Sequence, residues 1–179
     1  MAKPKKAKVD VELTESNTDP KGFTWKLESS YKKNGKLEFN NDKHPGFDVQ
    51  FDLDDKDDTG FRFPDDPDRA IAVKAYTGAE PSCPQYGETY GEFVPVSVEE
   101  DNTRLVVYNV NKTPTNFKYT LFVTKDPHGK DPLCEEIDPI GSNQNGPRYD
   151  SSFGVLAMVV GAGVIGLLLA VTFRIFERS

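Results

Sequence analysis

The sequence predicts an all-β protein: an antiparallel β-sandwich of about eight strands, followed by one C-terminal transmembrane helix. Two observations lead to this prediction. Hydrophobic and polar residues alternate in short segments throughout residues 9–125, which is the period of strands with one buried face. Near the C-terminus, residues 153–173 form an apolar run without a charged residue. At about 1.5 Å rise per residue, a helix of this length spans roughly 31 Å, close to the hydrocarbon core of a bilayer.

The first half of the chain contains four alternating segments, which we expect to be strands. They are residues 9–13, 23–27, 37–39 and 47–53. Residues typical of turns separate them, in Asp19–Gly22, Asn34-Gly35 and His44–Gly46. Asn-Gly is a strong hairpin signal, because both residues tolerate the positive φ of a tight turn. We therefore predict a hairpin between Tyr31 and Leu37.

The second half continues the same pattern. Its alternating segments are residues 71–75, 93–98, 104–110 and 117–123. Pro95 lacks a backbone donor, so the segment that contains it is expected at a sheet edge. Short strands with Gly and Pro turns favour an immunoglobulin-like architecture for the sandwich. The cysteine pair and central tryptophan of antibody domains are not at matching strands, so only the architecture is implied.

Composition divides the chain into five parts. They are a basic disordered arm (1–8), the sandwich (9–125), a Pro/Gly-rich extension and linker (126–152), the transmembrane helix (153–173) and a short tail (174–179). Within the extension, Gly141–Pro147 is typical of a linker. Seven extended residues reach at most about 25 Å, so the sandwich is expected close to the bilayer surface.

The predicted membrane helix carries small residues at helical spacing. Ala162, Gly166 and Ala170 fall four residues apart, and so do Ala157 and Gly161. Such a stripe lets the backbone of a neighbouring helix approach closely, although Gly and Ala are also ordinary in membrane helices. We expect these residues to pack against integral membrane subunits within the bilayer.

The orientation of the membrane helix follows from the N-terminus, with one conflicting signal. The opening MAKPKKAK is basic, but no apolar run follows it, so we do not expect it to be a signal peptide. We expect a single-pass tail anchor in the inner (cytoplasmic) membrane, with the sandwich in the cytoplasm. Arg174 and Arg178 after the span, against Arg148 before it, favour the opposite orientation. In the cytoplasm, Cys83 and Cys134 would be reduced.

The net charge of −7 disfavours nucleic acid as a partner. Nine Asp and two basic residues lie between Asp48 and Asp68. Within this run, four residues resemble a calcium loop: Asp55, Asp57, Thr59 and Asp66. An EF-hand would need a closing Glu and flanking helices, which this run lacks. We therefore expect no metal here, and interpret the run as a solvated loop or a patch that faces a basic partner.

Motifs for catalysis are missing from the sequence. The two histidines, His44 and His128, each lie in a turn-like tripeptide. No nucleophile elbow, zinc-protease motif or paired-cysteine motif is present. We therefore expect a protein that is not an enzyme, with no cofactor and no small-molecule substrate.

Two resemblances bear on function. The segment FKYTLFVTKDP, followed by Asp138-Pro139-Ile140, and the dipeptide Glu80-Pro81 are similar to small bacterial β-sandwich proteins with DP and EP dipeptides. The overall layout resembles single-span accessory subunits of bacterial photosynthetic and respiratory complexes. This resemblance implies a non-catalytic accessory or scaffold subunit, whose helix packs among others while the sandwich braces an extrinsic surface. A membrane-tethered ligand-binding or adhesion module remains the alternative.

Overall fold

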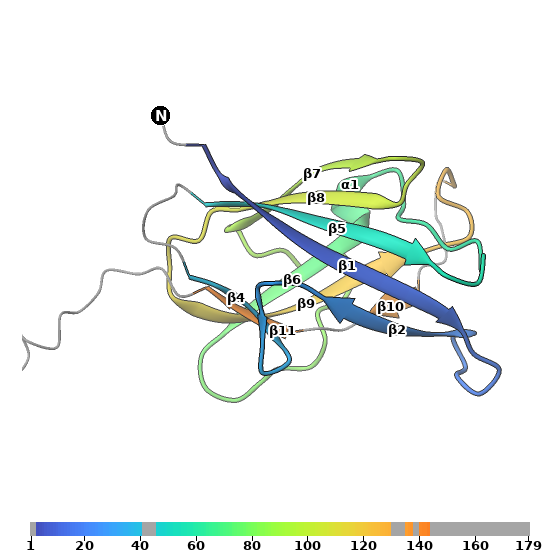
Figure 1. Ribbon diagram of the computed structural model, residues 1–179. Helices are drawn as coiled ribbons and strands as arrows, with labels where there is room; N and C mark the ends of the chain where they lie inside the picture. Colours follow the sequence, from blue (N-terminus) through green and yellow to red (C-terminus); the bar gives the residue numbers. More distant parts are fainter. Residues whose placement is uncertain (1–2, 41–45, 130–134, 138–139, 144–179) are drawn as a thin grey trace, which may run out of the picture. The chain divides into compact units, whose positions relative to one another are not determined.

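The computed structural model describes residues 3–40, 46–129, 135–137 and 140–143, which form two mixed β-sheets and almost no helix (Figure 1). The first sheet has the strand order β2-β1-β5-β8-β7. Its strands are β1 (Lys5–Glu15), β2 (Phe23–Glu28), β5 (Phe47–Asp55), β7 (Phe93–Glu99) and β8 (Arg104–Asn109). The two longest of these strands are β1 and β5, and β5 lies at the centre of the sheet between β1 and β8.

The second sheet is built around β9, which pairs with three other strands. Its order is β10-β9-β11-β4-β3, and β6 also pairs with β9. The strands are β3 (Lys32–Lys33), β4 (Lys36–Phe39), β6 (Ile71–Tyr76), β9 (Thr115–Val123), β10 (Glu135–Ile137) and β11 (Ile140–Asn143). Figure 1 shows the strands of the first sheet crossing over β6 and β9.

Aromatic side chains join the two sheets in a shared core. The ring centroids of Phe51 in β5 and Tyr119 in β9 lie 5.7 Å apart. Those of Phe93 in β7 and Phe117 in β9 are 4.5 Å apart. These residues are buried, as are the alternate residues of β1 from Ala7 to Leu13. The architecture is therefore β-sandwich-like, as predicted from the period of two.

All eight predicted strands are present, as β1, β2 and β4 to β9. The predicted hairpin is also confirmed, since Lys32 pairs with Leu37 and Asn34 and Gly35 both have positive φ. Pro95 lies in edge strand β7, as expected, next to a bulge. The short strands β3, β10 and β11 were not predicted, because two to four residues are too few to show an alternating pattern.

The prediction of purely antiparallel sheets is wrong in two places. Strand β1 pairs with β5 in parallel, from Lys5 opposite Phe47 to Leu13 opposite Asp55, and β4 pairs with β11 in parallel. Parallel neighbours need a long crossover connection, and here β2, β3 and β4 lie between β1 and β5 in the chain. An alternating pattern records which face is buried but not the direction of the neighbouring strand.

Two predicted boundaries also differ from the structure. Residues 5–8, assigned to a disordered arm, begin β1, and Ala7 between two lysines is fully buried. Residues 141–143, assigned to a linker, form most of β11 and lie between β4 and β9. Both segments were misassigned because Ala, Gly, Ser and Asn contribute little to a hydrophobic pattern.

Helix is almost absent from the described residues. The one helix there, α1, is the single turn Pro67–Ala70, capped by the Asp66 carboxylate. No helix in this part of the chain is long and apolar enough to cross a membrane. The predicted span, residues 153–173, lies outside the described residues.

We predict that Tyr119→Phe stabilises the fold. The Tyr119 hydroxyl is fully buried and has no hydrogen-bond partner among the described residues. Burial alone raises its pKa well above the ordinary value. Leaving such a group unsatisfied costs about 1–3 kcal/mol, so its removal should raise the free energy of unfolding by about 1 kcal/mol. Urea denaturation measures this change.

The control is Tyr31→Phe, which removes a hydroxyl that donates to the Lys6 carbonyl at 3.4 Å. It should not stabilise the protein. A loss of stability in Tyr119→Phe would instead mean that the buried hydroxyl has a partner.

Candidate interaction surface on the first sheet

A row of charged residues crosses the solvent face of the first sheet. Strand register places Glu28, Asp10, Asp52, Arg104 and Glu99 opposite one another in turn. All five share this face because each is one residue away from a core-facing position on its strand. We call this set the charged row.

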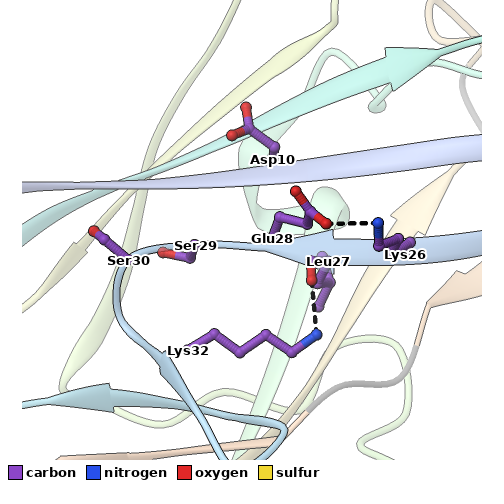
Figure 2. A pocket seen from close by; sticks show the side chains of 7 residues that line it. All are labelled: Asp10, Lys26, Leu27, Glu28, Ser29, Ser30 and Lys32. Atoms are coloured by element: carbon purple, nitrogen blue, oxygen red, sulfur yellow. Dashed lines mark hydrogen bonds and ion pairs between the residues drawn. The ribbon is translucent and has the colours of Figure 1, made fainter.

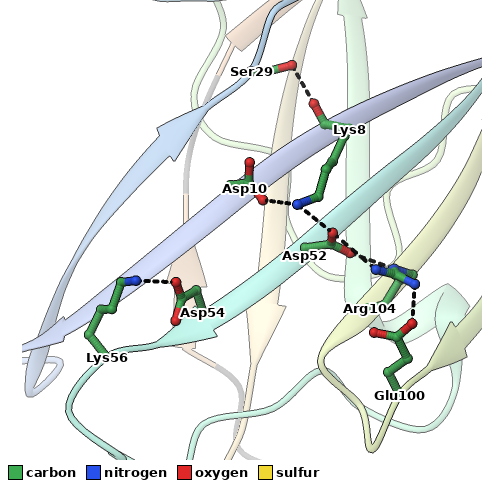
Figure 3. A network of polar contacts seen from close by, with 8 residues as sticks. All are labelled: Lys8, Asp10, Ser29, Asp52, Asp54, Lys56, Glu100 and Arg104. Carbon is green, nitrogen blue, oxygen red and sulfur yellow. Dashed lines mark hydrogen bonds and ion pairs between the residues drawn. The ribbon is translucent and has the colours of Figure 1, made fainter.

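Lys8 and Arg104 bind two carboxylates of the charged row, those of Asp10 and Asp52 (Figure 3). Lys8 Nζ lies 2.7 Å from Asp10 Oδ1 and 3.2 Å from Asp52 Oδ2. The Arg104 guanidinium donates to both Asp52 oxygens, at 2.6 Å from Nε and 3.2 Å from Nη2. Arg104 Nη1 also donates to Glu100. The network therefore spans three strands, β1, β5 and β8, and fixes the positions of its side chains.

Asp52 is the centre of this network. Partial burial raises the pKa of its carboxyl group, but hydrogen bonds from Arg104 and Lys8 outweigh burial and hold the pKa below its usual range. The same bonds raise the pKa of Arg104, through Asp52, and of Lys8, through Asp10 and then Asp52. All three groups are therefore charged at neutral pH.

An open groove lies next to this network, along β2 (Figure 2). Its volume is about 490 Å³, and its lining residues are Asp10, Lys26, Leu27, Glu28, Ser29, Ser30 and Lys32. Lys26 Nζ lies 2.6 Å from Glu28, and Lys32 Nζ donates to the Leu27 carbonyl at 2.7 Å. The wall of the groove therefore combines both charges with the backbone of β2.

The structure does not bring the four calcium candidates together into a ligand set. The Asp55 carboxylate accepts hydrogen bonds from Thr59, Gly60 and Arg62. Asp57 instead accepts from the Glu15 backbone, and Asp66 caps α1. No group of three or more potential metal ligands occurs among the described residues. The three carboxylates thus bind parts of this chain.

The acidic run is largely compensated from within the protein. Six of its nine Asp side chains bind other groups of the protein. The sequence showed the spacing of these residues but not the groups that they bind. These six are Asp52, Asp54, Asp55, Asp57, Asp65 and Asp66. This region is therefore not a uniformly acidic patch. Most of its carboxylates form hydrogen bonds or ion pairs that hold its loops in place.

One of these fastenings includes a histidine. His128 Nδ1 lies 2.8 Å from Asp65, which also accepts from the Asn102 amide at 2.7 Å. The hydrogen bond to Asp65 raises the pKa of His128. Both side chains are largely exposed, so this pair is a surface link between two loops. His44 lies outside the described residues.

A buried polar cluster, missed by the sequence reasoning, holds the last described strand. The Asn109 and Asn143 side-chain amides bond to each other at 2.8 and 3.2 Å, and Asn143 also donates to Glu92. The same Glu92 carboxylate accepts from the backbone of Lys112 and Thr113. Asparagine is common in turns at the ends of strands. The sequence around Asn109 and Asn143 therefore gave no sign that their side chains contact each other.

Of the other residues singled out in the sequence, some lie within the described residues and some lie outside them. Cys83 and Glu80 both approach Lys118, whose ammonium lies 3.1 Å from Glu80. Cys134 lies outside the described residues. So do all five predicted helix-packing residues: Ala157, Gly161, Ala162, Gly166 and Ala170.

We predict that the protein shows no calcium binding at micromolar concentration. Asp55 already accepts four hydrogen bonds, one of them from the Arg62 guanidinium at 3.1 Å. Calorimetric titration of the full chain in mild detergent tests this. A single-site isotherm that disappears in Asp57→Ala would contradict the prediction.

We predict that Asp52→Asn destabilises the fold by about 2 kcal/mol at pH 7, since it removes hydrogen bonds to two cations. A carboxyl group with a lowered folded-state pKa stabilises the protein above its ordinary pKa. This contribution is lost as the pH falls through the lowered value. The difference between wild type and variant should therefore shrink below about pH 4, measured by urea denaturation.

Asp54→Asn is the matched control, because Asp54 pairs with Lys56 at an exposed position. Its effect should stay below about 1 kcal/mol. Equal effects of the two substitutions would show that the charged row adds nothing beyond a surface ion pair.

Comparisons with known proteins do not assign this surface to a family. No protein-family model matches the chain. No curated protein matches it either. The function is therefore inferred from the residues and geometry of the chain itself.

Proposed function

We propose that this chain is a non-catalytic accessory or scaffold subunit of a multi-subunit bacterial membrane complex of the energy-transducing type. In this proposal, the helix at 153–173 packs against neighbouring membrane helices. The β-domain, an immunoglobulin-like sandwich, braces an extrinsic surface of the same complex. The partners are integral membrane subunits and the lipid bilayer.

The charged row and its network are the main support for a bracing role. Residues from three strands are held together by ion pairs that leave their outer atoms in water, with the Lys8 and Asp10 side chains 60% and 51% exposed. Such a surface presents both signs of charge in fixed positions. Complementary charges on a partner set the register of an interface more than its strength.

Apolar residues beside the network support the same role. Val94 and Val96 in β7 are 46% and 55% exposed, at one edge of the first sheet. Protein interfaces combine an apolar centre with a polar rim. The valines of β7 and the charges of β8 and β5 provide both on one continuous sheet.

The sequence after the β-domain supports attachment to a membrane. Nine residues separate Asn143, the last described residue, from the apolar run that begins at Phe153. A partner surface near the bilayer would lie within reach of a domain on so short a connection. We place the domain on the cytoplasmic side, with the run as a tail anchor in the inner membrane.

The helix is tested by Gly166→Leu. Lipid tails are as apolar as Leu, so close packing through small residues has to provide the attraction between helices. Leu favours insertion but blocks close approach. We expect the variant to remain in the membrane and to lose its partners when purified from native membranes in mild detergent.

Leu168→Ala is the control and should retain the partners. Equal retention of partners by Gly166→Leu and wild type would show that the span is only an anchor.

Protease added to spheroplasts should spare the β-domain. Digestion would reverse the orientation and favour the second candidate, a tethered ligand-binding or adhesion module that uses the groove along β2.

A further inference from the structure

Strand β2 forms one edge of the first sheet. It pairs with β1 in an unbroken register of six residue pairs, and no described strand pairs with its other side. The opposite edge, β7, carries Pro95 and a bulge, which both hinder further pairing. In the second sheet, Val73 of β6 donates to the Glu88 carbonyl, which covers part of that edge.

The backbone groups of β2 that face this open edge can be identified. Ser29 donates its hydroxyl to the Lys8 carbonyl, so the even-numbered residues of β1 face β2. By the antiparallel register, the even-numbered residues of β2 face β1 and the odd-numbered ones face away. The hydrogen bond from Lys32 Nζ to the Leu27 carbonyl agrees with this, because that carbonyl is free of β1 and points to the open side of β2. Trp25 and Leu27 therefore direct their amide and carbonyl groups to the open edge.

We propose that β2 pairs with β2 of a second copy of this chain, antiparallel, about a two-fold axis at Leu27. The two first sheets then become one continuous sheet. Leu27 faces its own copy as a hydrogen-bonded pair, since its backbone groups point to the edge. On the solvent face, Lys26 lies opposite the partner subunit's Glu28, and Glu28 lies opposite the partner subunit's Lys26.

Charge complementarity selects this register over its neighbours. An axis at Lys26 would place two lysines opposite each other, and an axis at Glu28 would do the same with two glutamates. Like charges directly opposite destabilise a strand pair, whereas opposite charges stabilise it. Only the axis at Leu27 makes two Lys–Glu pairs, because a two-fold axis repeats each contact.

Two features at the edge fit a second copy. Trp25, on the core-facing side of β2, is 37% exposed although it lies opposite the fully buried Leu13. A second β2 would cover more of this ring. The Lys32 ammonium, shown in Figure 2 beside the Leu27 carbonyl, would give way to the amide of the partner subunit's Leu27. Until then, Lys32 satisfies the carbonyl and limits uncontrolled pairing.

Sedimentation equilibrium of the full chain in mild detergent tests the proposal. The wild type should show a reversible monomer–dimer equilibrium. Lys26→Glu and Glu28→Lys each place like charges opposite each other twice, so each should raise the dimer dissociation constant about tenfold or more. The double variant Lys26→Glu/Glu28→Lys restores both pairs and should recover the wild-type constant.

The control is Lys112→Glu, which makes the same charge change on an exposed loop residue and should leave the dimer unchanged. Trp25 is the only tryptophan, so its fluorescence should shift to the blue as the dimer forms. A monomer at all concentrations, or a double variant as weak as the single ones, would overturn the proposal. The proposal would also be overturned if Lys26→Glu or Glu28→Lys left the mass of the chain in sedimentation unchanged but abolished its co-purification with a different membrane protein. The β2 edge would then bind that protein and not a second copy.

Discussion

The parallel pairing of β1 with β5 is the constraint on which the rest of this structure depends. Nine residue pairs join the two strands through the middle of the first sheet. Their inward residues form one wall of the core. The same register sets Asp10 beside Asp52 on the outer face, where Lys8 joins them. The pairing of β1 with β5 therefore determines both the core residues on one face of the sheet and the charged residues on the other.

Like charges side by side would weaken such a ladder unless cations intervened. Asp10 and Asp52 are neighbours by register, yet Lys8 lies between their carboxylates and Arg104 binds Asp52 from the next strand. The two cations therefore stabilise the β1–β5 pairing, because they offset the repulsion between the Asp10 and Asp52 carboxylates. This explains why Asp52 keeps a low pKa although it is partly buried.

The sequence was most informative where a local pattern decides the structure. Period-two alternation located eight strands, Asn34-Gly35 located a hairpin, and Pro95 identified an edge. These features depend on a residue and its near neighbours along the chain. The strand period and the turn chemistry are therefore readable without knowing the fold.

Features that depend on distant segments could not be read in this way. The parallel neighbours of β1 and β4 are decided by how the chain crosses between sheets, and Ala7 conveys little about its own burial. The Asp-rich run resembled a metal loop because its spacing is local. Asp52 and Asp57 of this run take their partners, Lys8, Arg104 and Glu15, from other strands. The meeting of Asn109 with Asn143 is equally non-local.

The enclosure of β11 has a mechanical consequence. The strand lies between β4 and β9, and the Phe117 ring covers Gly141 so closely that an added Cβ would lie 2.3 Å from it. The amide of Asn143 fastens the end of the strand to β8 and Glu92. A force applied to the chain beyond Asn143 and directed along β11 would load both ladders in shear. Their hydrogen bonds would have to break together, so the fold resists a pull in this direction more than one that peels β11 away pair by pair.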